Sequence, residues 1–201
     1  MPEHSSRRER NRLEVIERLM QAGMQLLSAK PIADITVEEL SALGRVSRKT
    51  FYNHFPSKQD LIERISERLL IAQSEENYAA AMAQCATTRE RLELFLTLQG
   101  RNLSDSELLE RNLIKHAMLD LSSDSERSRN KLEHSVAIFE RLLTAGRELG
   151  DVNDRYSPRF LAEMLAGALN TSAIHWIHFP GYPLNGRFRD LKRLLIEIAI
   201  K

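Results

Sequence analysis

Residues 36–58 read TVEELSALGRVSRKTFYNHFPSK, and this stretch decides the fold of the first part of the chain. Its apolar spacing predicts two short helices, at 36–43 and 47–54, that meet at a tight turn. Gly44 lies in that turn and suits the end of a helix. Capping signals stand where the two helices would begin: Thr36 with Glu39, and Ser47. The stretch therefore predicts a helix-turn-helix unit.

The second of these helices has two chemically different faces. Phe51 and Phe55 lie on one side at about 100° per residue, where they would pack into a core. The opposite arc carries cationic, aromatic and amide side chains: Arg48, Lys49, Tyr52 and Asn53. Such a helix suits the major groove of DNA, where Arg or Lys binds guanine edges and Asn binds adenine. Phosphate oxygens, which fix register without reading sequence, suit Tyr52, His54 and Lys58.

The local charge pattern supports DNA binding better than the total charge does. The net charge of +1 gives only weak support for a nucleic-acid partner. Residues 41–59, however, contain no acid and four cations: Arg45, Arg48, Lys49 and Lys58. A second cluster near the N-terminus would suit the DNA backbone or minor groove, although basic termini are often only disordered: Arg7, Arg8, Arg10 and Arg12. Because helix-turn-helix units also occur as packing corners with a solvated charged face, the pattern favours DNA recognition without excluding that alternative.

Residues 35–61 resemble the DNA-binding region of the TetR (tetracycline repressor) family of bacterial transcriptional regulators. In that family an opening Thr and a short helix precede Val-Ser, and a run of the form Tyr-x-His-Phe-x-x-Lys-x-x-Leu follows. The chain supplies the matching residues at the same spacing: Thr36, Val46, Ser47, Thr50, Phe51, Tyr52, His54, Phe55, Lys58 and Leu61. A match of this length is highly specific.

The resemblance implies a role for each matched position. Arg48 and Lys49 would face bases, with Asn53 on the same helix and Ser47 at its start. The phosphate backbone would be contacted by Thr36, Thr50, Tyr52, His54 and Lys58. The family usually has Ala-Gly-Val in the turn, whereas this chain has Gly44, Arg45 and Val46. The flexible residue is thus displaced by one, which leaves the conformation of the turn open and suggests a phosphate contact for Arg45.

The remainder of the chain predicts further helices. All six prolines fall at the N-terminus or between periodic segments. With the capping signals they predict about nine helices, near 8–28, 36–43, 47–54, 57–83, 88–101, 105–120, 124–149, 158–178 and 187–200. The expected fold class is therefore all-α. Because the helices are mostly short before Pro56 and long after it, we expect a helix-turn-helix DNA-binding domain at 1–56 and a larger ligand-binding and dimerisation domain at 57–201.

In the TetR family the last two long helices of each subunit pack into a four-helix dimer interface. Here the apolar residues implied for a homodimer are Leu161, Leu165, Ala168, Leu169, Phe188, Leu191 and Leu195. An apolar stripe is also typical of core within one chain, so the resemblance carries most of this prediction. DNA geometry supports it independently, because one short helix contacts too few base pairs to select a genomic site.

Most family members enclose a ligand pocket in the middle helices, which implies a small-molecule effector. Candidate lining residues are Phe95, Gln99, Asn102, His116, Met118, Phe139, Asn170, His175 and Trp176. Each of these, taken singly, is more typical of ordinary core. His175 and His178 have a spacing compatible with a metal pair, but no acid or cysteine lies nearby in the sequence, so we expect no metal. Because Cys85 is the single cysteine, an internal disulfide is excluded. We expect this thiol to be inert, and redox sensing through it is a minor alternative.

Composition argues against several other classes of protein. Hydrophobic and charged fractions of 42% and 28% are ordinary for a soluble globular protein. No apolar run approaches the roughly 18 residues of a membrane span, and the charged N-terminus does not resemble a signal peptide. Gly-rich phosphate loops, a defensible Ser/His/Asp arrangement and paired carboxylates are not found in the sequence. We therefore expect a cytoplasmic protein of the nucleoid that is not an enzyme and uses no cofactor.

These features predict a transcriptional repressor that binds a palindromic double-stranded operator as a homodimer and is released by a small-molecule effector. One alternative is a DNA-binding regulator or nucleoid-associated protein without an effector, which would keep the palindrome but show no ligand dependence. Another is a helical interaction module that does not bind DNA, in which replacing Lys49 and Tyr52 would change nothing. The sequence leaves open the operator, the effector and the regulated genes.

Overall fold

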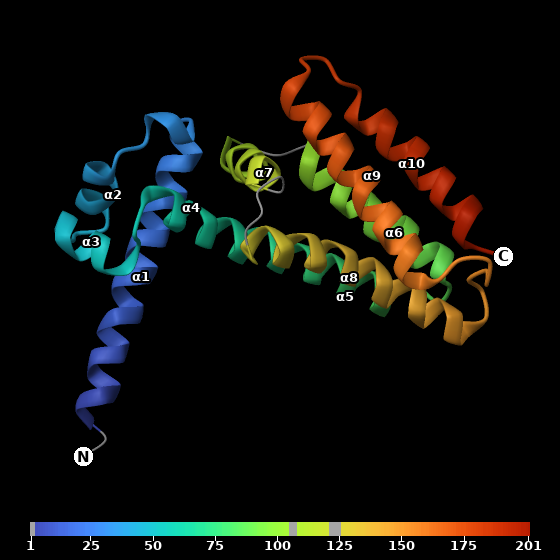
Figure 1. The fold of residues 1–201 in the computed structure, drawn as a ribbon, viewed down its shortest axis with the longest axis horizontal. Helices are drawn as coiled ribbons and strands as arrows, with labels where there is room; N and C mark the ends of the chain where they lie inside the picture. Colours follow the sequence, from blue (N-terminus) through green and yellow to red (C-terminus); the bar gives the residue numbers. More distant parts are fainter. Residues whose placement is uncertain (1–2, 105–107, 121–125) are drawn as a thin grey trace. The chain divides into compact units, whose positions relative to one another are not determined.

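The computed structural model describes residues 3–104, 108–120 and 126–201, and within these ranges the chain is predominantly helical (Figure 1). The predicted all-α fold, with an N-terminal helix-turn-helix and a larger C-terminal helical part, is confirmed. The chain forms two compact units, one made of Met1–Leu69 with Glu107–His116 and the other of Leu70–Ser106 with Ala117–Lys201. Within the described ranges, no helix has both the length and the apolarity needed to cross a membrane.

The first unit is built on four helices that follow one another in the chain. They are α1 (Glu3–Ala29), α2 (Val37–Leu43), α3 (Arg48–His54) and α4 (Lys58–Ser66), with a 3-10 turn, η1 (Ile32–Asp34), before α2. Their fully buried apolar side chains form the core of this unit: Leu19, Leu27, Ile35, Leu40, Phe51, Leu61, Ile62 and Ile65. Gly23 lets α1 and α4 approach closely, since a Cβ there would lie 2.5 Å from Cδ1 of Ile65. The close packing of α1 on α4 therefore depends on the missing side chain at Gly23.

Helix α1 is longer than predicted, because it begins at Glu3 instead of residue 8. The four N-terminal arginines lie on an exposed part of this helix and not in an extended arm: Arg7, Arg8, Arg10 and Arg12. Only one of them has an ion pair among the described residues, a 3.4 Å contact between Arg12 and Glu9. Their proposed contact with DNA stays a prediction.

A segment from the middle of the chain completes the first unit, which the sequence did not predict. The first part of α7 (Leu108–Asp120) belongs to this unit and not to the C-terminal part. The buried Asn112 donates through Nδ2 to the carbonyl oxygens of Leu27 and Lys30, at 2.8 and 3.1 Å, at the C-terminal end of α1. Nε2 of His116 lies 3.0 Å from a carboxylate oxygen of the buried Glu63 in α4. Two side chains of α7 therefore bond to the end of α1 and to α4.

The helix predicted at 57–83 is continuous but not uniform. It begins at the Ser57 cap, whose hydroxyl accepts from the backbone N–H of Asp60, and runs through α4. A π-helical turn, η2 (Glu67–Ile71), follows and leads directly into α5 (Ala72–Gln84). The turn spans the point in the chain where the first unit ends and the second begins.

The second unit contains the remaining long helices. They are α5, α6 (Thr88–Ser104), α8 (Glu126–Leu149), α9 (Pro158–His178) and α10 (Leu184–Ala199). Its core contains an edge-on pair of rings, Phe95 and Phe139, whose centroids are 5.2 Å apart. At the end of the chain, Val152 and Ile200 form an antiparallel bridge, so the segment before α9 holds the C-terminus.

The contact between Asn112 and α1 predicts a specific loss of stability. Replacing Asn112 by Ala removes two hydrogen bonds and leaves two backbone carbonyls without these donors. We expect the free energy of unfolding of the first unit to fall by about 1–3 kcal/mol, measured by urea denaturation. The exposed Asn11→Ala variant in α1 is the matched control and should lie within about 0.5 kcal/mol of wild type. Equal stability of the two variants would contradict a holding role for Asn112.

Candidate nucleic-acid interface

Helix α2 starts from a complete capping box. Oγ1 of Thr36 accepts from the backbone N–H of Glu39, and the Glu39 carboxylate accepts from the backbone N–H of Thr36. Lys30 also donates to this carboxylate. The hydrogen bond from Lys30 and the two from Thr36 lower the pKa of Glu39 from 4.5 to about 2. The carboxylate is therefore ionised above that pH, and its contribution to stability is lost only as the pH falls from about 4.5 towards 2.

In the turn between α2 and α3, one residue provides the close packing and its neighbour adopts the left-handed conformation. Gly44 has an ordinary helical φ of −72°, and a Cβ there would lie 2.8 Å from Cδ2 of Leu19 and 3.0 Å from the carbonyl oxygen of Leu40. Glycine is therefore needed at 44 for close packing. The left-handed residue is Arg45, with a φ of 52°, a conformation that costs a non-glycine residue roughly 1–2 kcal/mol. This settles the conformation that the displaced glycine left open.

Helix α3 has the two faces that the sequence predicted. Oγ of Ser47 caps it by accepting from the backbone N–H of Thr50 at 3.0 Å. Phe51 and Phe55 are buried, and the centroids of their rings are 6.0 Å apart. The opposite face is exposed and carries Arg48, Lys49, Tyr52 and Asn53. Tyr52 is 46% exposed although its ring packs edge-on against Phe51. This contact with Phe51 positions the ring on the exposed face of α3.

Two of the expected DNA contacts have partners inside the chain. Nη1 of Arg48 lies 2.8 Å from a carboxylate oxygen of Glu38 in α2. Nζ of Lys58 donates to the carbonyl oxygens of Ile32 and Ile35, at 2.8 and 2.6 Å. Two of the three ammonium protons of Lys58 are thus used to hold the loop before α2, and a phosphate contact from Lys58 stays a prediction. Arg48 is exposed, but to contact a base it must either break its ion pair with Glu38 or move together with the Glu38 side chain.

The hydroxyl contacts expected for Thr36 and Thr50 are also partly used within the unit. Oγ1 of Thr36 donates to Glu39, and Oγ1 of Thr50 lies 2.9 Å from Oγ of Ser47. Thr50 and His54 are half-buried, whereas Thr36 is exposed. Hydroxyl oxygens keep further hydrogen-bonding capacity, so phosphate contacts at these three positions stay predictions.

Known proteins share the sequence of the helix-turn-helix segment. The sequence profile described as "Bacterial regulatory proteins, tetR family" matches residues 19–65, which cover the C-terminal part of α1 together with α2, α3 and nearly all of α4. The first unit therefore resembles the DNA-binding part of TetR family regulators. The HTH-type transcriptional regulator EthR of Mycobacterium tuberculosis is 35% identical over 52 residues, which are 26% of this chain and 24% of EthR. The chain thus matches about a quarter of the length of this curated relative.

Solved structures extend the similarity over both units. FadR of Thermus thermophilus, a TetR family transcriptional repressor in complex with lauroyl-CoA, superposes with a TM-score of 0.74 at 25% identity, covering 90% of this chain and 93% of FadR. SmeT, the repressor of the Stenotrophomonas maltophilia multidrug efflux pump SmeDEF, also gives a TM-score of 0.74, at 20% identity over 92% of this chain and 90% of SmeT. The TetR fold therefore extends over nearly the whole chain.

The residues predicted for a dimer interface are mostly part of the subunit's own core. Leu161, Leu165 and Leu195 are buried in the core of the second unit, and the buried Phe188 lies against Gly100 of α6. The other three are half-buried: Ala168, Leu169 and Leu191. Helical periodicity thus identified the apolar stripe but not the neighbours that cover it, and a role of the half-buried residues in a dimer stays a prediction. A partner subunit would meet the exposed residues beside this stripe.

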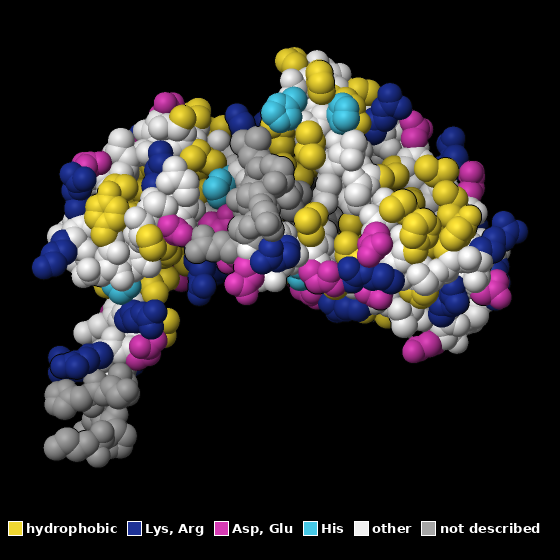
Figure 2. Space-filling model, in the orientation of Figure 1, with side chains coloured by type: hydrophobic (Ala, Val, Ile, Leu, Met, Phe, Trp, Pro, Cys, Tyr) yellow, Lys and Arg dark blue, Asp and Glu magenta, His cyan; other side chains and the backbone are white. Residues whose placement is uncertain are grey.

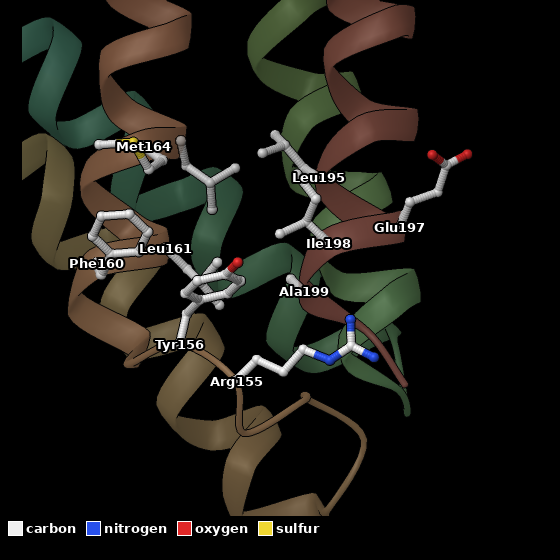
Figure 3. Close-up of a pocket in the computed structure, with 10 residues that line it drawn as sticks. Arg155, Tyr156, Phe160, Leu161, Met164, Leu195, Glu197, Ile198 and Ala199 are labelled. Atoms are coloured by element: carbon white, nitrogen blue, oxygen red, sulfur yellow. The ribbon is translucent and has the colours of Figure 1, made fainter.

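An exposed apolar surface does exist on α9 and α10 (Figure 2). It includes Tyr156, Phe160, Met164, Leu194 and Ile198. Between the two helices lies a groove of about 430 Å³, with Phe160 and Met164 on one side and Ile198 on the other (Figure 3). Arg155 and Glu197 lie at its edge and place opposite charges beside the apolar floor.

The residues predicted to line a ligand pocket have different surroundings. Phe95 and Phe139 fill the core of the second unit against each other. Gln99 is half-buried and donates to Oγ of Ser74 at 3.0 Å. His116 is bonded to Glu63 in the first unit, and the side chain of Asn102 lies outside those that the structure describes.

The remaining pocket candidates lie towards the end of α9 or are half-buried elsewhere. His175 is exposed and stacks on the rings of Phe179 and Tyr182, at 5.4 and 5.5 Å. Half-buried positions are occupied by Met118, Asn170 and Trp176. His175 therefore does not line the core that holds Phe95, and the set predicted from the sequence is not a single site within the second unit. Among the described residues, no group of three or more His, Cys, Asp or Glu side chains is arranged to hold a metal.

The ion pair between Glu38 and Arg48 predicts an effect on the affinity for non-specific DNA. An exposed pair of this kind contributes only about 0–1 kcal/mol to folding, so Glu38→Gln should unfold as wild type does. Because the change removes a negative charge beside α3 and frees Arg48, we expect the affinity for an unrelated duplex to rise about threefold or more at low salt. Fluorescence anisotropy with labelled DNA measures this, and Glu76→Gln on the exposed surface of α5 is the control. Equal affinities for Glu38→Gln and wild type would show that the pair does not restrain Arg48.

Proposed function

We propose that the chain is a transcriptional repressor that binds a palindromic DNA operator as a homodimer and is released by a small-molecule effector. The observation that carries the DNA-binding part is the exposed face of α3, held outwards by the burial of Phe51 and the cap at Ser47. Lys49 is placed to donate to guanine, Asn53 to bind adenine, and Tyr52 to bind a phosphate. Since its target is the chromosome, we place the protein in the cytoplasm with the nucleoid and assign it no catalytic step.

A second copy of the chain is the partner that the surface on α9 and α10 fits best. Met164 and Phe160 are 51% and 44% exposed beside the groove, which is unusual for large apolar side chains at the centre of a surface. In a two-fold symmetric interface each residue can meet the partner's copy of another, so Arg155 of one subunit can face Glu197 of the other. A dimer also presents two copies of α3, as a palindromic site requires.

The effector is inferred from a solved structure of the same fold. FadR of Thermus thermophilus, with which the chain shares fold and 25% identity, binds lauroyl-CoA. An effector of this chain would occupy the second unit and lower DNA affinity by binding more tightly to the form that does not bind DNA. Lauroyl-CoA is the first compound to test, and a regulator without an effector is the alternative that would remain if no compound weakened operator binding.

The DNA-binding proposal is tested by selecting bound sequences from random duplex DNA with purified protein. We expect convergence on a two-fold palindrome. Lys49→Ala should relax one base position in each half-site at a cost of about 1–3 kcal/mol, and Tyr52→Ala should weaken binding to all sequences about equally. Lys115→Ala, an exposed change in α7 that removes the same charge, should select the wild-type operator. No convergence, together with indifference to Lys49 and Tyr52, would favour the interaction module that does not bind DNA.

The dimer proposal is tested by placing a charge on the exposed apolar surface. Met164→Glu should sediment as a monomer and bind the operator more than about 100-fold more weakly, because a monomer offers one half-site contact. Circular dichroism should remain that of wild type, since the side chain is exposed. Leu132→Glu changes another exposed apolar side chain, on α8 and outside the groove (40% exposed, against 51% for Met164), and should remain dimeric. A dimeric Met164→Glu variant, or a monomeric wild type, would contradict the proposed interface.

A further inference from the structure

Arg45 combines a strained backbone with a free positive charge. Its φ of 52° lies in the left-handed region, which a side chain with a Cβ adopts at a cost in free energy. The conformation is held by the turn, because the N–H of Arg45 donates to Ala42 and that of Val46 donates to Ser41. Glycine would satisfy the same turn without strain. An arginine at this position therefore needs an explanation outside the turn itself.

The cations of residues 41–59 are not equally available to a partner. Arg48 is paired with Glu38, and Lys58 donates to the carbonyl oxygens of Ile32 and Ile35. Arg45 and Lys49 are both exposed, and neither has an ion pair within the part of the chain that the structure describes. Half of the local positive charge is thus used inside the unit, and Arg45 carries much of what is left for a partner.

The position of Arg45 suits a backbone phosphate. It stands two residues before Ser47, the cap of α3, and so at the end of α3 that enters the groove first in helix-turn-helix proteins. Phosphates border the groove at that point, and a guanidinium can donate two parallel hydrogen bonds to one of them. Lys49, within the first turn of α3, is left to contact a base edge.

We propose that Arg45 is the backbone clamp of each recognition helix, binding one phosphate beside the half-site, and that the strain of the turn is retained for this contact. The proposal rests on the DNA-binding function proposed above and names a contact within it. Lys58, two of whose protons bond Ile32 and Ile35, is less available for this role. It fixes the register of α3 without contributing to the choice of bases.

Three substitutions separate the charge of Arg45 from its strain. Arg45→Gly removes both, Arg45→Asn removes the charge but keeps a side chain that tolerates the left-handed region, and Arg45→Lys keeps charge and strain. Arg89→Gln, an exposed charge removed from the start of α6, is the control for total charge. Melting temperature, operator affinity across a salt series and ethylation interference are measured for each variant on the operator selected by wild type.

Arg45→Gly should melt about 2–4 °C higher than wild type, because the strain is relieved. Its operator affinity should fall about tenfold. The slope of log affinity against log salt should decrease in magnitude by about 2, because each of the two subunits loses one phosphate contact. One phosphate per half-site whose ethylation blocks wild type should lose its effect in the Gly and Asn variants, while the preferred bases stay the same. Arg45→Lys should retain most of the salt slope.

A Gly variant that binds with wild-type affinity, slope and interference pattern would overturn the clamp, and one that melts lower than wild type would overturn the strain argument. Failure of the proposed function is distinguishable from either result. In that case wild type selects no operator, and the clamp is judged from the salt slope of wild type and Arg45→Gly on random duplex DNA. Equal slopes there would again contradict the proposal.

Discussion

Burial of Phe51 is the constraint on which the proposed interface depends. The side chain has no exposed surface, so α3 cannot rotate about its axis without bringing an aromatic ring into water. At about 100° per residue, this fixes Lys49, Tyr52 and Asn53 on the outer face. The cap at Ser47 fixes where the helix starts, and the contact of Gly44 with Leu19 fixes how closely the turn approaches α1. The chemistry of the outer face is thus presented by packing on the inner one.

Internal hydrogen bonds and ion pairs change which charges are available for recognition. The stretch around α3 looks uniformly basic as a sequence, yet Lys58 serves the loop before α2 and Arg48 shares its charge with Glu38. A protein with fewer free cations binds non-specific DNA less tightly, because that affinity is largely electrostatic. Discrimination between operator and bulk DNA then depends more on base contacts from α3. In the proposed complex, the first unit would therefore gain specificity at some cost in general affinity.

Local features of the sequence predicted much of this structure, and long-range contacts account for what it missed. The caps at Thr36 and Ser47 and the two faces of α3 depend on residues within four positions of each other, so their patterns are visible in the sequence. Asn112 binds a carbonyl 85 residues away, and nothing near it in the sequence indicates that partner. The residues of the dimer surface are hard to predict for a related reason, since an apolar stripe such as that of Leu161 does not say whether its own chain or a partner covers it. Met164, the exposed neighbour, could be recognised only once the core was known.

The most direct measurement of the central claim is a crystal structure of the protein bound to its selected operator duplex. The account predicts two copies of α3 in successive major grooves, about 34–36 Å apart, with Lys49 against a base edge and Tyr52 against a phosphate. It also predicts that Phe51 stays buried and that Lys58 keeps its bonds to Ile32 and Ile35. A complex in which another surface of the first unit meets the DNA, or in which α3 points away from the groove, would contradict the account.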